Sequence, residues 1–143
     1  MKSPRLETEQ ISTYYDEQTN FVHIAYRGKL TPDITIQAYG WLAEMSTIVD
    51  SKTIKGSIID FSGVTEFDSR NLSTAQKESR RANTELDFSH IPVALVVSTP
   101  LQDQMVRLSM QVTPEEQRKR VVKSQAEGLA FIAEWRQRFG DQA

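Results

Sequence analysis

The sequence predicts an α/β domain with a mixed sheet of about five strands and four helices. Three observations lead to this fold class. Two β-rich segments open the chain, and strand-like and helix-like segments then alternate to its end, in the order β-β-α-β-α-β-α-β-α. Two of the later strand segments are almost wholly apolar, which is typical of parallel strands covered on both faces. The 143 residues are also enough for one domain with a substantial core.

The two opening strands are predicted over residues 11–15 (ISTYY) and 21–27 (FVHIAYR), which are rich in β-branched and aromatic side chains. The polar sequence DEQTN lies between them, so the two strands should form an antiparallel hairpin. Residues 1–10 are mostly polar and charged and carry no signal-peptide pattern. We therefore expect a flexible N-terminus over residues 1–10 and a single domain over residues 11–140.

The first helix is predicted over residues 32–50. Thr31 is a favoured N-cap residue, and Pro32 suits the first helical position because it lacks the N–H that a helix start leaves unpaired. Apolar side chains then recur at helical spacing and define one buried face. They are Ile34, Ala38, Trp41, Leu42, Met45 and Ile48.

Residues 57–61 (SIIDF) and 92–97 (PVALVV) are the two apolar strand segments, and each is followed by a helix start. The first helix start is Asp68-Ser69, and the second is Thr99-Pro100, which opens a helix over 100–112. That helix has an apolar face formed by Leu101, Met105, Leu108 and Val112. Val106 and Met110 lie off this face, which indicates either burial on two sides or a homodimer contact.

The last strand and helix are predicted at the C-terminal end of the chain. Residues 120–123 (RVVK) form the strand. Ser124 and Glu127 have the spacing of a capping box, and Gly140 is well placed to end the helix that they begin.

Composition excludes several classes of site. The chain has no cysteine and only two histidines, so it offers neither a disulfide framework nor a sulfur- or histidine-rich metal site. The net charge of −2 argues against nucleic-acid binding. No glycine-rich phosphate loop, dinucleotide fingerprint or nucleophile motif is present, so we expect no cofactor and no enzymatic activity. The longest apolar strand run, residues 93–97, is far shorter than the roughly 20 residues of a transmembrane helix, and we expect a cytoplasmic protein.

The stretch of residues 58–72, IIDFSGVTEFDSRNL, carries the strongest functional signal. It leaves the carboxyl end of a buried strand, where ligands gather in open α/β sheets. Asp68 and Ser69 are favoured helix N-cap residues, and that structural role explains them without any function. In the alternative reading, a phosphate on Ser69 would be stabilised by the helix N-terminus and Arg70 and repelled by Asp68 and Glu66.

The same stretch resembles the signature of STAS domains, and the chain is most similar to the SpoIIAA-like group of small bacterial proteins. The matching positions are Asp60, Gly63, Val64, Phe67, Asp68, Ser69 and Leu72. The resemblance implies a STAS-like fold over nearly the whole chain and a non-enzymatic regulatory module that binds a protein partner, as anti-sigma-factor antagonists do. It also implies that Ser69 is the phosphoacceptor. The implied interaction loop contains Asp60, Glu66, Phe67, Asp68, Arg70 and Asn71. The chain departs from the pattern at Arg70-Asn71, where antagonists usually carry a small residue followed by glycine.

Two other functions are compatible with the sequence. The first is a carrier or sensor of a small apolar, lipid-like ligand, with a pocket under helix 100–112 or between the terminal helix and the sheet. The residues that would line it are Trp41, Met45, Leu101, Met105 and Leu108, although their helical spacing is equally typical of ordinary core packing. The second is a dimeric structural protein that binds no ligand.

Overall fold

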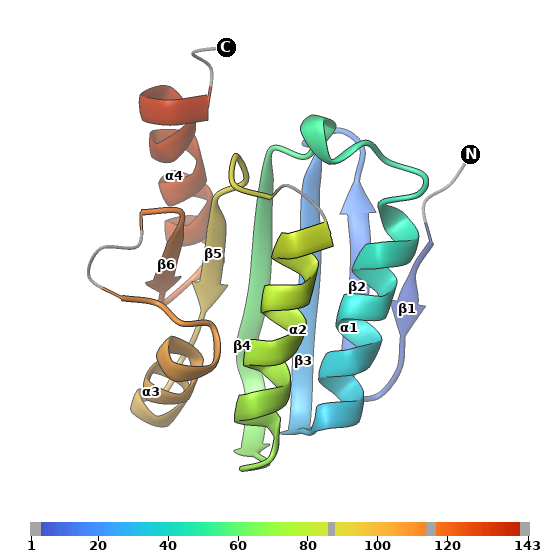
Figure 1. Cartoon of the computed structure of the whole chain (residues 1–143). Coiled ribbons are helices and arrows are strands. Elements are labelled where there is room, and N and C mark those ends of the chain that lie inside the picture. The colour runs from blue at the N-terminus through green and yellow to red at the C-terminus, as the bar shows by residue number, and fades with distance from the viewer. Residues whose placement is uncertain (1–3, 86–87, 114–116, 141–143) are drawn as a thin grey trace.

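The structure is a computed structural model that describes residues 4–85, 88–113 and 117–140. One six-stranded sheet has its strands in chain order, β1-β2-β3-β4-β5-β6 (Figure 1). The strands are β1 (Leu6–Glu7), β2 (Ile11–Asp16), β3 (Phe21–Leu30), β4 (Gly56–Phe67), β5 (Val93–Val96) and β6 (Lys119–Val122). The α-helices are α1 (Pro32–Met45), α2 (Asn71–Glu85), α3 (Pro100–Ser109) and α4 (Gln125–Trp135).

The predicted fold class is confirmed, because strands β1 to β3 pair antiparallel and strands β3 to β6 pair parallel. The strand number is corrected from about five to six. The additional strand is β1, in which Leu6 lies opposite Thr13 and donates its backbone N–H to the Thr13 hydroxyl at 3.0 Å. Two residues are too few to show the alternation by which a strand is recognised, so the sequence left this segment in the N-terminal tail. The Trp41 indole also donates to the Pro4 carbonyl at 2.8 Å.

Strands β3 and β4 are longer than predicted. β3 extends to Leu30 rather than residue 27, and β4 extends to Phe67 rather than residue 61, so most of the predicted loop is strand. The pairing of β3 with β4 is interrupted by register shifts, and Gly28, which lies at one of them, has φ of +72°. A Cβ at Gly63 would lie 3.0 Å from the Tyr26 carbonyl oxygen, so a larger residue would crowd the neighbouring strand. The turn-like residues at this point therefore mark a bulged pairing rather than the end of the strand.

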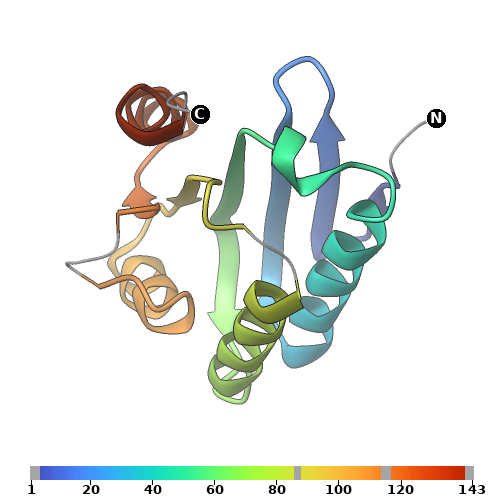
Figure 2. The ribbon, with the colours of Figure 1, turned by 45° about the horizontal axis from the view of Figure 1, so that its top comes forward.

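The sheet is covered on both faces, by α1, α2 and α3 on one side and by α4 on the other (Figures 1 and 2). Alternate β5 residues belong to the two cores: Leu95 packs with the first group of helices and Val96 packs under α4. This double coverage is why the apolar run in β5 is continuous. The core under α4 also contains Phe131 and Ile132, which fill the interface between this helix and the sheet.

Helix α1 begins as predicted and ends earlier. The Thr31 hydroxyl accepts the Ile34 backbone N–H, and Pro32 is the first helical residue. The helix ends at Met45 rather than residue 50, and the Ser46 hydroxyl donates to the Leu42 carbonyl at 2.8 Å. No glycine or proline marks this end in the sequence, which is why the prediction ran too far.

Helix α3 packs on a different face from the one predicted. Gln102 and Val106 are buried, whereas Leu101 and Leu108 are 55% and 49% exposed. The Gln102 amide donates to the carbonyls of Ser62 (3.1 Å) and Val64 (2.9 Å) in β4. Its oxygen accepts the backbone N–H of Ser98 at 2.7 Å. A polar side chain with its hydrogen bonds satisfied can thus turn this face inward, against the apolar pattern of the helix. The prediction that Leu101 and Leu108 lie on the buried face of this helix is therefore wrong.

Within the described residues, no helix combines the length and apolar character that crossing a bilayer requires.

Candidate functional site

The candidate site is the turn that connects β4 to α2. Because β4 continues to Phe67 and α2 begins at Asn71, this turn is reduced to Asp68, Ser69 and Arg70. The Asp68 backbone N–H donates to the Leu30 carbonyl at 3.0 Å, so the turn begins where the β3–β4 pairing ends. The Asn71 N–H donates to the Asp68 carbonyl at 2.9 Å and closes the turn onto the helix.

The Asp68 carboxylate holds this turn in one conformation. Its side chain is 7% exposed and takes three hydrogen bonds from Arg70. Oδ1 accepts the Arg70 backbone N–H at 2.9 Å and Nε at 3.1 Å, and Oδ2 accepts Nη2 at 2.7 Å. The hydrogen bond from the Arg70 side chain, followed by that from its backbone, lowers the pKa of Asp68 to about 2. Asp68 is therefore ionised at any pH near neutrality, and the Arg70 guanidinium lies against the turn.

Ser69 lies at the exposed tip of this turn, between the two residues of the ion pair. Asp68 was predicted to cap the helix by accepting a backbone N–H. Its carboxylate does accept one, but from Arg70, which lies just before the first residue of α2. The Ser69 side chain is thus presented to solvent immediately before the N-terminus of α2.

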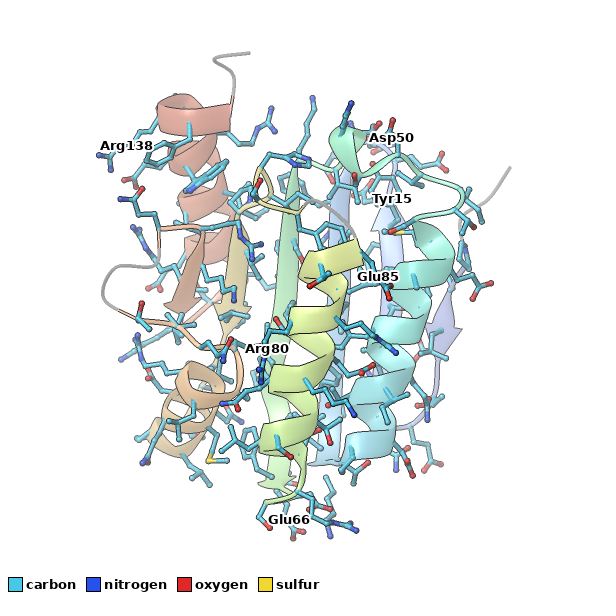
Figure 3. The ribbon with its side chains drawn as sticks, viewed as in Figure 1. Tyr15, Asp50, Glu66, Arg80, Glu85 and Arg138 are labelled. Carbon is cyan, nitrogen blue, oxygen red and sulfur yellow. The ribbon has the colours of Figure 1, made fainter. Side chains whose placement is uncertain are left out.

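The other predicted loop residues do not form one cluster. Asp60 lies within β4, where its carboxylate accepts the Ser62 N–H at 2.8 Å. Seven residues of strand lie between it and Asp68, a separation of about 25 Å at roughly 3.3 Å per residue, so the structure does not bring the two together. Glu66 is exposed at the end of β4 and pairs with Lys29 at 3.1 Å (Figure 3). Phe67 is half-buried against the core.

Asn71 completes the predicted loop, and it also turns inward. Asn71 is only 5% exposed and is therefore buried. Of the predicted phosphoacceptor and the six predicted interaction-loop residues, therefore, only Ser69, Glu66 and Arg70 are exposed.

A polar stripe continues from the turn along the outer face of α2. It consists of Ser69, Arg70, Ser73, Lys77 and Arg80, all exposed, and we call it the α2 surface. Figure 3 shows Arg80 on the outer side of this helix. The last four residues are spaced by three, four and three positions, which places them on one side of a helix. This stripe was not predicted, although its spacing is visible in the sequence.

The predicted apolar pocket is not found at the residues proposed for it. Trp41 and Met45 are buried in the core under α1, at 4% and 0% exposure, and Leu101 and Leu108 face outward on α3. Met105 is half-buried. None of these five residues lines the cavities found among the described residues between α1, α2 and the sheet. Gln102 faces the sheet and bonds β4, so Leu101 and Leu108 of the same helix face away from the sheet.

Within residues 4–85, 88–113 and 117–140, no cluster of three His, Cys, Asp or Glu side chains is arranged to hold a metal ion.

Several solved structures have a similar fold, and three of them match over most of both chains. An uncharacterised protein of the DUF3478 family from Shewanella loihica, described as having a SpoIIAA-like fold, matches with a TM-score of 0.61 and 16% identity over 89% of this chain and 97% of its own. A serine-to-glutamate variant of RsbS from Moorella thermoacetica matches with a TM-score of 0.57 and 17% identity over 96% of this chain and 99% of its own. An anti-sigma factor antagonist from Mycobacterium paratuberculosis matches with a TM-score of 0.54 and 17% identity over 90% and 99%.

These matches show that the chain has the STAS/SpoIIAA-like fold, as the resemblance in its sequence predicted. At these identities the likeness concerns the fold alone. No model of a protein family matches the chain, and no curated protein matches its sequence.

Proposed function

We propose that this protein is a non-enzymatic regulatory module that binds a protein partner through the α2 surface. The observation that carries the proposal is the Asp68–Arg70 turn, in which a buried carboxylate holds an exposed serine and arginine in one conformation. A surface that is already ordered loses less conformational entropy on binding. The fold also supports the proposal, since one solved protein of similar fold is an anti-sigma factor antagonist. The proposal requires no cofactor, metal or nucleic acid and places the protein in the cytoplasm.

The chemistry of the α2 surface indicates an acidic partner. Lys77 and Arg80 project from it, and both are exposed. Arg70 adds a guanidinium that is 78% exposed even though it bonds Asp68. Charges at the rim of an interface mainly steer association and select partners. A partner with Asp and Glu side chains on its own docking face would complement this stripe.

Ser69 is the residue at which such a surface would be regulated. Phosphorylation would add a charge of about −1.5 to −2 to its hydroxyl, at the end of the basic stripe nearest the helix N-terminus. That charge would be attracted to Arg70 and would offset the positive charge that attracts an acidic partner. We therefore propose that modification of Ser69 weakens partner binding.

Affinity capture from the native cells, followed by titration of the purified partner, tests this proposal. Lys77→Glu combined with Arg80→Glu should weaken binding about tenfold or more, because it replaces attraction by repulsion. Ser69→Asp should weaken binding, whereas Ser69→Ala should leave it close to that of the unmodified protein. Lys123→Glu is the matched control for Lys77→Glu alone, since each reverses one exposed cation and Lys123 lies between β6 and α4, away from the α2 surface.

Two results would contradict the proposal. One is a partner whose affinity is the same for the unmodified protein and the double charge-reversal variant. The other is an equal loss of affinity in Lys123→Glu and Lys77→Glu, which would show a general effect of net charge rather than a docking face on α2.

A further inference from the structure

A space that is partly open to solvent lies between helices α1 and α2 and the sheet. It consists of two adjoining cavities of about 80 and 40 Å³. Side chains from the sheet, α1 and the end of α3 border both cavities. The shared residues are Ile24, Tyr39, Leu42, Ile59 and Met110. The two cavities therefore lie side by side: the larger reaches to Lys119, and the smaller reaches to Asn71 in the first turn of α2.

The smaller cavity contains an unpaired polar atom. Asn71 is 5% exposed and lines this cavity, and its Oδ1 has no hydrogen-bond partner among the described residues. The hydroxyl groups of Tyr26, Thr35 and Tyr39 also border this cavity, but none of them bonds to Asn71 Oδ1. A buried carbonyl left without a donor costs free energy, and native proteins seldom retain one without a reason. A bound molecule with a hydrogen-bond donor would satisfy this atom.

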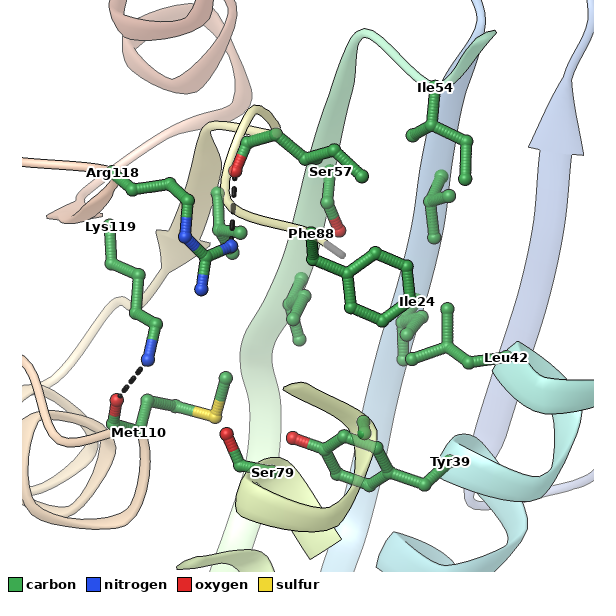
Figure 4. A pocket seen from close by; sticks show the side chains of 15 residues that line it. Ile24, Tyr39, Leu42, Ile54, Ser57, Ser79, Phe88, Met110, Arg118 and Lys119 are labelled. Atoms are coloured by element: carbon green, nitrogen blue, oxygen red, sulfur yellow. Dashed lines mark hydrogen bonds between the residues drawn. The ribbon is translucent and has the colours of Figure 1, made fainter. Parts of the chain in front are cut away.

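The walls of the larger cavity favour a neutral and mainly apolar molecule. Val22, Ile54 and Phe88 are among the side chains that surround it, as Figure 4 shows for Ile54 and Phe88. The two cations at its outer end are engaged by the backbone: Arg118 donates to the Ile91 carbonyl at 3.1 Å and Lys119 to the Met110 carbonyl at 2.9 Å (Figure 4). Their charge is thus directed at carbonyl oxygens rather than at an anionic ligand.

We propose that this space is a binding site for a small, neutral, mainly apolar molecule that carries one hydrogen-bond donor, as an aromatic or branched alcohol does. The donor meets Asn71 Oδ1, and the apolar body lies among Ile24, Ile59 and Met110. The flexible Met110 side chain borders both cavities and can adapt to the occupant. The site is distinct from the α2 surface, because it lies on the inner side of that helix. Failure of either proposal leaves the other intact.

Phenol and benzene are suitable probes because they differ by one hydroxyl group. The intact protein, labelled at its Ile, Leu and Met methyl groups, is titrated with each probe and followed by NMR. Saturable shifts are expected at Ile24, Ile59 and Met110 with both probes. In Asn71→Leu, which has a similar shape but no acceptor, the affinity for phenol relative to benzene should fall about tenfold, the usual value of one net hydrogen bond.

A second variant tests the site without altering Asn71. Ala75→Leu places three additional carbon atoms beside Asn71 in the smaller cavity, so both probes should bind more weakly. Ala43→Leu is the control, because it makes the same substitution at an exposed position on α1.

The proposal is overturned by any of three results. The first is the absence of saturable shifts at these methyl groups with both probes, which would mean that the space holds only water. The second is an unchanged phenol-to-benzene ratio in Asn71→Leu. The third is equal probe affinity in Ala75→Leu and Ala43→Leu.

Discussion

Replacement of Gln102 by methionine tests how α3 is attached to the sheet. Gln102 is 3% exposed, and its side chain bonds four backbone groups: the carbonyls of Ser62 and Val64 and the N–H groups of Ser98 and Thr99. Methionine has nearly the same length and shape but offers none of these hydrogen bonds. Gln102→Met therefore removes the polar attachment with little change in volume.

The cost can be worked out from the surroundings of each group. The Val64 carbonyl is bonded in a buried setting, and leaving it unpaired costs about 2 kcal/mol. The other three groups are only partly buried and can regain water, so each costs about 0.5–1 kcal/mol. Burial of the apolar methionine side chain returns about 1 kcal/mol. We expect Gln102→Met to lower the free energy of unfolding by about 3 kcal/mol.

Urea denaturation measures this change, with an unchanged dependence on urea showing that the same structure unfolds. Gln104→Met is the matched control, because Gln104 is exposed on the same helix. A difference of less than about 1 kcal/mol between the two variants would refute the role assigned to Gln102.

Gln102→Glu gives an independent check of the same contact. A carboxylate would face the Ser62 and Val64 carbonyls, and only its protonated form can donate to them. Its pKa should therefore be higher in the folded than in the unfolded protein, and the folded state should bind more protons. The stability of this variant should then rise as the pH falls through the raised pKa. A stability independent of pH relative to Gln104→Glu would contradict this account.

Three further predictions concern the turn, the sheet and the core. Asp68→Ala should abolish hydrogen-exchange protection of the Arg70 amide, which the carboxylate accepts. In the unmodified protein, the contribution of Asp68 to the stability of the folded state is complete above about pH 4. It is lost only as the pH falls towards about 2, because the pKa of Asp68 is lowered to about 2. Burial lowers the pKa of His23 from 6.5, so the unfolded chain binds the proton first and the unmodified protein should lose stability as the pH falls from 7 to 5. His23→Gln should remove this loss; equal pH profiles of the two proteins in urea denaturation would contradict the prediction. Met45→Ala should cost about 2–5 kcal/mol and Leu101→Ala less than about 0.5 kcal/mol, since Met45 is fully buried and Leu101 is exposed; thermal unfolding should rank them in this order.

The order and type of the main elements could be read from the sequence. The hairpin, the two apolar strands and the helix starts at Thr31 and Ser124 were all identified and are present. These features depend on interactions over a few residues, such as the Ser124 hydroxyl accepting the Glu127 N–H at 3.1 Å. Such contacts are encoded in the local residue pattern, so one sequence is enough to detect them.

The extent of the strands depended on partners elsewhere in the chain. β1 exists because Leu6 lies beside Thr13 in β2, and the polar end of β4 remains a strand because β3 pairs with it as far as Leu30 and Phe67. No local pattern records such pairings, and for this reason the two strands were predicted to end too early, at residues 27 and 61.

For the candidate site, the sequence by itself determined where it lies: Asp68 and Ser69 follow a buried strand and precede a helix. It also contained the basic stripe of the α2 surface. Only the tertiary structure decided which side chains face inward. Asn71 became a buried, unpaired acceptor, and Gln102 replaced the leucines of α3 against the sheet by bonding carbonyls 38 and 40 residues earlier in the chain. Burial of a polar group is favourable or costly according to the partner that reaches it, and that partner is supplied by folding rather than by neighbouring residues.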